Sequence, residues 1–64
     1  MTPEERGRII RTARIDAGIS ARQLQELTGI NRVTIYNLER GKHKQPHKTT
    51  LKALSAALNI KELV

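Results

Sequence analysis

Residues 20–41 decide the fold, and they read SARQLQELTGINRVTIYNLERG. Ser20, with a glutamine three residues later, has the spacing of a capping box and predicts a helix that begins directly after it. Gly29 is expected to end this helix, because glycine readily takes the left-handed backbone conformation found there. Asn31 then predicts the cap of a second helix, which Gly41 ends. The stretch therefore predicts two short helices joined by a tight turn.

The second of these helices, over about residues 32–40, has two chemically different sides. Ile35 and Leu38 make one side apolar. The opposite side carries Arg32, Val33, Tyr36, Asn37 and Arg40. Arginine pairs with guanine, asparagine pairs with adenine, and valine contacts the thymine methyl group in the DNA major groove. We therefore expect Arg32, Val33, Asn37 and Tyr36 to read DNA bases.

Further helices are predicted on both sides of this motif. Thr2, followed by a proline and by a glutamate at the third helical position, predicts a helix start. This helix is expected to run to about Ala17 and to end at Gly18. A fourth helix is expected to begin near Thr49 or Thr50, after a polar loop, and Asn59 is expected to cap its end. Residues 60–64 add at most one further turn.

Helical spacing selects the apolar residues that we expect to be buried. They are Ile9, Ile10, Ala13, Ala17, Ile19, Leu24, Leu27, Ile30, Ile35, Leu38, Leu51, Leu54, Ala57, Leu58, Ile60 and Leu63. Arg6, Arg8 and Arg11 are expected to face away from this core. The 64 residues hold no cysteine and a single aromatic residue, so one small domain over residues 1–64 must be stabilised by packed aliphatic side chains.

The net charge of +6 is concentrated in one part of the chain. Residues 32–48 contain five arginines and lysines against Glu39, and so account for +4 of it. Such a one-sided basic surface is typical of proteins that bind a polyanion, and nucleic acid is favoured over a membrane surface. A charge that serves only solubility is the alternative.

Several other functions have little support in the sequence. No apolar run is long enough to span a membrane, and no signal peptide is recognisable, so we expect a cytoplasmic protein. His43 and His47 have a metal-like spacing only if their loop is helical, which Pro46 disfavours, so we expect no metal, no cofactor and no small-molecule ligand. An enzyme is the poorest interpretation, because the chain has no cysteine, no acid pair in a plausible pocket and no phosphate-binding glycine loop.

With these motifs in place, the chain resembles the phage repressor and Cro-type helix-turn-helix family, also called XRE-like. The resemblance covers roughly residues 8–60. It rests on Arg14, Gly18-Ile19-Ser20, Leu24, Gly29-Ile30-Asn31, Thr34-Ile35, Leu38-Glu39-Arg40-Gly41 and Pro46. It implies an all-α, compact, lambda-repressor-like domain of four to five helices. Gln25 departs from the family pattern, which usually has a small alanine there. We expect either that its long side chain reaches solvent at the helix edge or that the crossing of the two helices shifts slightly.

The resemblance also implies roles for individual residues. It makes residues 32, 33 and 37 the main base readers, and it pairs Arg14 with Glu39, which orients the recognition helix. Phosphate contacts are expected from Arg14, Ser20, Ala21, Arg22, Arg40, Lys42, His43, Lys44 and His47. Some residues keep alternatives: Val33 can serve packing, Arg32 and Arg40 can be solvated, and Arg14 and Glu39 can be two exposed charges. Tyr36 can contact phosphate, a partner subunit or the first helix.

These expectations together predict a sequence-specific regulator of transcription of bacterial or phage type that binds double-stranded DNA and is associated with the nucleoid. A small repressor that binds a palindromic operator as a homodimer fits best. The alternative is an antitoxin or protein-interaction adaptor with the same fold. RNA binding is weakened by the shortage of aromatic residues for base stacking.

Overall fold

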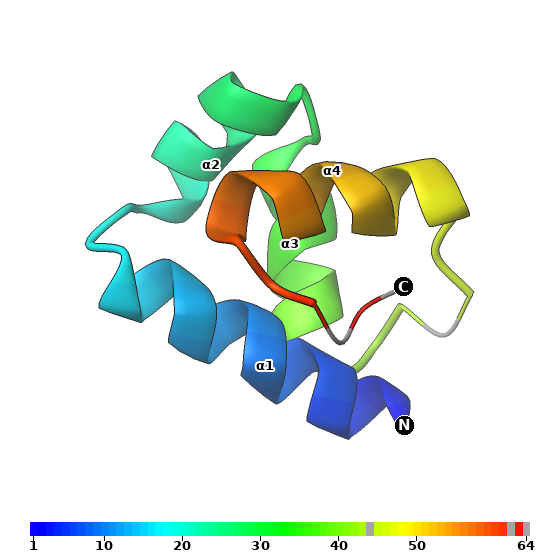
Figure 1. The fold of residues 1–64 in the computed structure, drawn as a ribbon. Coiled ribbons are helices and arrows are strands. Elements are labelled where there is room, and N and C mark those ends of the chain that lie inside the picture. The colour runs from blue at the N-terminus through cyan, green and yellow to red at the C-terminus, as the bar shows by residue number, and fades with distance from the viewer. Residues whose placement is uncertain (44, 62, 64) are drawn as a thin grey trace.

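A computed structural model describes residues 1–43, 45–61 and 63, and these residues form four α-helices and no strand. The helices are α1 (Pro3–Asp16), α2 (Ala21–Thr28), α3 (Arg32–Glu39) and α4 (Lys48–Leu58). Helix α1 lies along one side, α2 and α3 form the motif, and α4 crosses in front of α3 (Figure 1). The predicted all-α helix-turn-helix fold is therefore confirmed. Lys44, an expected phosphate contact, lies outside the described residues.

The helix starts follow the predicted caps. In α1 the Thr2 hydroxyl accepts from the Glu5 amide at 3.1 Å, and the Glu5 carboxylate accepts from the Thr2 amide at the same distance. That backbone hydrogen bond, with a smaller effect of the Thr2 side chain, holds the pKa of Glu5 below its ordinary value. Ser20 and Gln23 form the same reciprocal pair at the start of α2. Capping chemistry thus places both helices where the sequence indicates.

The helix ends also follow prediction. Gly29 ends α2 with φ +77°, and Asn59 ends α4 with φ +55°. Both lie in the left-handed region, where glycine and asparagine carry the least strain. The start of α4 differs slightly from prediction, because the helix begins at Lys48 after His47 and has no side-chain cap.

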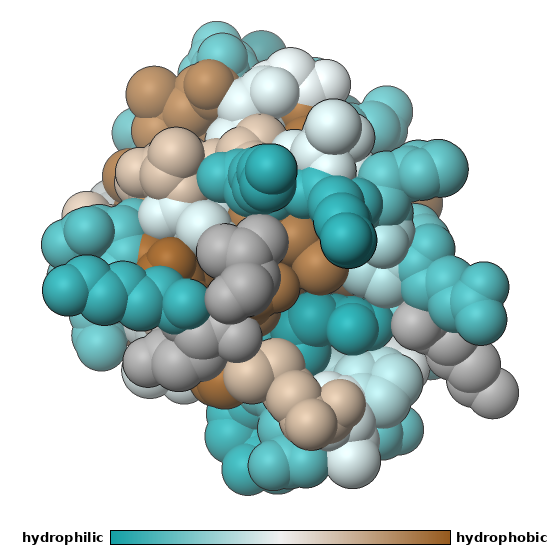
Figure 2. Space-filling view, turned by 45° about the vertical axis from the view of Figure 1, so that its right-hand side comes forward, coloured by the Kyte–Doolittle hydropathy of each residue, from teal (hydrophilic) through white to brown (hydrophobic). Residues whose placement is uncertain are grey.

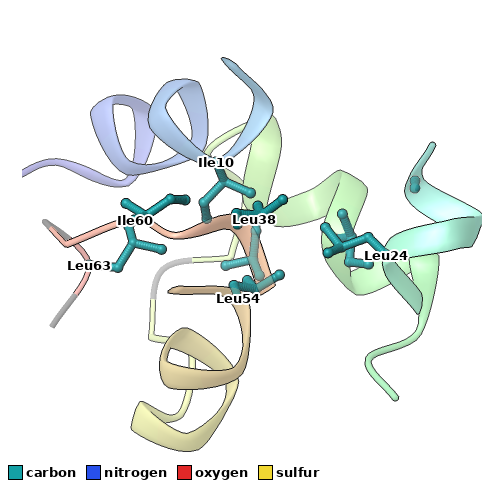
Figure 3. Close-up of a cluster of buried hydrophobic side chains, with 9 residues drawn as sticks. Ile10, Leu24, Leu38, Leu54, Ile60 and Leu63 are labelled. Carbon is teal, nitrogen blue, oxygen red and sulfur yellow. The ribbon is translucent and has the colours of Figure 1, made fainter. Parts of the chain in front are cut away.

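The core is a single aliphatic cluster to which every helix contributes. Its buried members are Ile10, Ala21, Leu24, Ile35, Leu38, Leu54, Leu58, Ile60 and Leu63. Figure 3 shows Leu38 between Ile10 and Leu54, with Ile60 and Leu63 beside Ile10. Ile60 and Leu63, which follow α4, therefore pack back on the core beside the first helix.

Three predicted core residues and one predicted surface residue are placed differently. Leu27 is 65% exposed, because the inward stripe of α2 runs through Ala21, Leu24 and Thr28 and leaves Leu27 at its outer edge. Ala17 and Ala57 are also exposed, at the end of α1 and on the outer side of α4. Figure 2 shows hydrophobic side chains near the centre of one face, as expected of a chain too small to cover all its apolar surface.

The sequence predicted that Arg6 faces away from the core, but its side chain makes a contact within the domain. Its guanidinium donates from Nη2 to the carbonyl oxygen of His43 at 2.8 Å, and the side chain is half-buried. The first helix therefore holds the loop after α3, through a contact between residues 37 positions apart in sequence.

Gly7 allows α1 and α3 to pack so closely that their backbones are in contact. A Cβ atom at this position would lie 2.3 Å from the carbonyl oxygen of Leu38 and 2.6 Å from that of Glu39. Backbone atoms cannot rotate away as a side chain does, so any larger residue would push the two helices apart. The position of the recognition helix on the first helix therefore depends on this glycine.

Candidate nucleic-acid interface

The outer side of α3 is exposed to solvent. Val33 is 61% exposed, Tyr36 is 40% exposed, and Arg32 and Arg40 are also exposed. Asn37 is half-buried, one helical turn after Val33. The structure therefore brings all four expected base readers onto one side of an eight-residue helix.

The inner side of the same helix is fixed in the core. Ile35 is fully buried and Leu38 is 1% exposed. These two residues anchor α3 in the core, and the methyl groups of Val33 reach solvent on the opposite side. Val33 is therefore not required for packing. The packing alternative for Val33 therefore has no support in the structure.

The N-terminus of α3 is held by two side chains, and sequence reasoning anticipated only one of them. Asn31 Oδ1 accepts from the Val33 amide at 2.8 Å, as its capping role predicts. Gln25 Oε1 accepts from the Arg32 amide, also at 2.8 Å. Solvent exposure was one expectation for Gln25, but its length allows it to bridge from α2 to the first residue of α3. The departure from the usual alanine was the only sequence signal of this contact.

Arg14 and Glu39, which the resemblance pairs, lie together in the structure. Arg14 donates from Nε to Glu39 Oε2 at 2.6 Å and from Nη2 to Oε1 at 3.1 Å. A third hydrogen bond runs from Nη1 to the carbonyl oxygen of Ile19 at 3.1 Å. Arg14 is 14% exposed and Glu39 is 5% exposed, so the two are not separate surface charges. Hydrogen bonding to Glu39 raises the pKa of Arg14 above its ordinary value.

This ion pair resolves an electrostatic problem at the end of α3. A carboxylate near a helix C-terminus is repelled by the partial negative charge of the helix dipole. The bidentate guanidinium offsets that repulsion and ties α3 to α1 and to the segment before α2. The orientation of the recognition helix is therefore determined by a charged clamp as well as by the core.

The expected phosphate contacts surround α3. Ser20 and Arg22 are exposed at the start of α2, whereas the side chain of Ala21 is 2% exposed, so only its backbone amide can reach a ligand. Lys42 and His47 are exposed in the loop before α4. Basic side chains and helix N-terminal amides thus lie on both sides of the exposed helix, an arrangement suited to DNA backbone phosphates.

Residues 1–43, 45–61 and 63 contain neither a metal-binding cluster nor a helix able to span a membrane. No three His, Cys, Asp or Glu side chains among them are arranged to hold a metal ion. Nor does any helix in residues 1–43 or 45–61 have the length and apolarity needed to cross a membrane.

In the described residues, the second helix of the motif exposes a polar side and has basic residues around it. This arrangement is typical of DNA-binding helix-turn-helix proteins. The chain belongs to the Cro/C1-type helix-turn-helix family, whose sequence model matches residues 10–63. No curated protein sequence matches it. It is similar in structure to the restriction-modification controller protein C.AhdI from Aeromonas hydrophila, with a TM-score of 0.86 and 28% identity. That similarity covers 97% of this chain and 96% of C.AhdI. The chain is accordingly a DNA-binding transcription regulator.

Proposed function

We propose that this regulator reads a specific DNA sequence with α3 in the major groove and binds as a homodimer to a palindromic operator. The observation that carries the proposal is the division of α3 into a buried side and an exposed side of base-reading residue types. Ile35 and Leu38 hold α3 against the core, so the positions of Arg32, Val33 and Asn37 relative to the rest of the domain are fixed.

Each base reader has a distinct partner. Arg32 lies at the start of α3, where its guanidinium can donate two hydrogen bonds to O6 and N7 of guanine. Val33 contacts a thymine methyl group with its exposed methyls, and Asn37 pairs with adenine one turn further along. The capped Arg32 amide supports this assignment, because it limits how far the start of α3 can move.

The phosphate contacts supply affinity rather than specificity. The amides of residues 20–22 at the start of α2 receive one phosphate, and Arg22, Lys42, Lys44 and His47 contact the backbone beside the groove. Each neutralised phosphate releases bound counterions, so binding weakens as salt is raised. Arg40 and Arg14 border the same surface.

A dimer follows from the length of the reading helix. Eight residues at about 1.5 Å each span about 12 Å, which matches only about four base pairs. A site that short recurs by chance too often to identify one operator. Two copies on half-sites about one helical turn apart double the length that is read. Occupancy of such an operator excludes polymerase, which makes the chain a repressor acting in the cytoplasm.

The similarity to C.AhdI supports a narrower role as a second candidate. That protein is a restriction-modification controller, and its structure matches nearly the full length of both chains. We propose on this basis that the operator controls restriction-modification genes.

Two substitutions test the division between base reading and phosphate contact. Asn37→Ala is expected to relax the preference at one base pair, whereas Lys42→Ala is expected to weaken binding to all sequences alike and to reduce the salt slope by about 1. Affinities of both variants are measured on a duplex selected from random sequences and on its single-base variants. If Asn37→Ala weakens all duplexes uniformly, the assignment of Asn37 to base reading is wrong.

A further inference from the structure

A depression between α1 and α3 lies beside Arg32, Val33 and Asn37, the residues proposed to read bases, and includes Tyr36. It is lined by Arg11, Arg14, Tyr36, Glu39 and Arg40. Arg11 comes from the first helix, which is not part of the helix-turn-helix motif, and it is exposed. The sequence placed no functional role on Arg11, because only the folded chain brings it beside the last turn of α3.

The accessible charge of this depression is positive. Glu39 is the only acidic residue in its lining, and its two carboxylate oxygens both accept hydrogen bonds from Arg14. At 5% exposure, that carboxylate offers little surface to a ligand. Among the described residues, no carboxylate forms a salt bridge with Arg11 or Arg40. Two guanidinium groups therefore remain to attract an anion.

Tyr36 adds a neutral donor to the same depression. The Arg40 guanidinium lies over its ring, 5.7 Å from the ring centroid, an arrangement that holds the two side chains together. The Tyr36 side chain is 40% exposed, and its hydroxyl can donate one hydrogen bond. Two cations and one hydroxyl around a shallow surface suit a phosphodiester, which spreads one negative charge over two oxygens.

We propose that this depression binds one phosphate of the DNA backbone, with Arg11 and Arg40 as cationic contacts and the Tyr36 hydroxyl as a donor. The inference rests on the proposed DNA-binding function and deepens it in two ways. It adds Arg11 to the interface, and it assigns Tyr36 to the backbone rather than to a base.

The first helix supplies a matched control for Arg11. Arg8 is also exposed and carries the same charge, but it lines a separate depression with Ile9 and Thr12. Arg11→Ala and Arg8→Ala therefore remove the same charge from the same helix at two different depressions. Arg11→Gln, which keeps a long polar side chain, guards against loss of folding, and far-UV circular dichroism checks each variant.

The affinity of each variant for the selected duplex is measured over a range of salt concentrations. Arg11→Ala and Arg11→Gln are expected to lower the magnitude of the log–log salt slope by about 1 and to weaken all duplexes alike. Arg8→Ala is expected to leave that slope unchanged. Tyr36→Phe is expected to weaken binding about two- to tenfold without changing base preference.

Three results would overturn the inference. Equal slopes for the Arg11 and Arg8 variants would show that Arg11 contacts no phosphate, while the proposed function would stand. A change of base preference in Tyr36→Phe would return that residue to base reading. Failure of the unsubstituted protein to bind any duplex would overturn both the inference and the function on which it rests.

Discussion

Glu39→Gln is expected to lower the free energy of unfolding by about 1–2 kcal/mol. The substitution keeps the size of the side chain but removes its charge and one acceptor oxygen. Arg14 then loses one of two charged hydrogen bonds, now at 2.6 and 3.1 Å, each of a kind that contributes about 1.5–3 kcal/mol. The stability of the domain and the orientation of α3 should both suffer.

Three features of the structure set this magnitude below the cost of breaking a fully buried pair, about 3–5 kcal/mol. Arg14 is 14% exposed, so water reaches part of its guanidinium. It also keeps its hydrogen bond to the Ile19 carbonyl oxygen. Finally, removal of a negative charge near the end of α3 recovers about 0.3–1 kcal/mol of unfavourable interaction with the helix dipole.

Urea denaturation at neutral pH, followed by circular dichroism, measures the loss. Glu26→Gln is the matched control, because Glu26 is exposed on α2 and the same substitution there is expected to change stability by no more than about 0.5 kcal/mol. A loss of stability in Glu39→Gln of less than about 0.5 kcal/mol would show that the Arg14–Glu39 ion pair does not stabilise the fold. A double-mutant cycle with Arg14→Met should give a coupling energy of about 1–3 kcal/mol.

Three further substitutions test contacts that hold the helices in place. Gly7→Ala should destabilise the protein by about 2 kcal/mol or more, although alanine favours a helix by about 1 kcal/mol, because its Cβ would lie 2.3 Å from the Leu38 carbonyl oxygen. A urea midpoint at or above that of the parent would contradict this close approach. Gln25→Met leaves the Arg32 amide without its acceptor, so amide hydrogen exchange there should be about five- to tenfold faster by NMR, and unchanged exchange would rule out the cap. Glu5 has a lowered pKa, so its charged form stabilises the fold above its ordinary pKa of 4.5, and that stability is lost as the pH falls through the lowered value. The parent should therefore melt above Glu5→Gln at pH 7, and the gap in Tm should narrow as the pH falls through the lowered pKa of Glu5; a gap that widens in acid would show the opposite sign.

Local signals in the sequence predicted most of the helix boundaries. Ser20, Asn31 and Gly29 act through hydrogen bonds and backbone angles within a few residues, so their effects can be read directly from the chain. The burial of Leu38 followed in the same way from helical spacing. Leu27 was misplaced because an eight-residue helix with only two large apolar residues does not define which edge of its stripe faces inward.

Contacts between distant segments were not predictable in the same way. The Gly7 approach, the Arg6 contact to the loop and the Gln25 cap each join residues from different elements. Their geometry depends on how the helices cross, which no local pattern records. Arg14 and Glu39 were anticipated only because a family resemblance paired them, and the place of Arg11 beside them was not anticipated at all.

The central claim is that this chain reads a DNA sequence, and salt-titrated binding to a selected duplex tests it most directly. Duplexes bound from a random pool should share two inverted half-sites about one helical turn apart. Affinity for that site should fall linearly on a log–log plot against salt, with a slope of several units, and should exceed the affinity for a scrambled duplex at every concentration. Equal affinity for the selected and scrambled duplexes, or no binding even at low salt, would contradict the account.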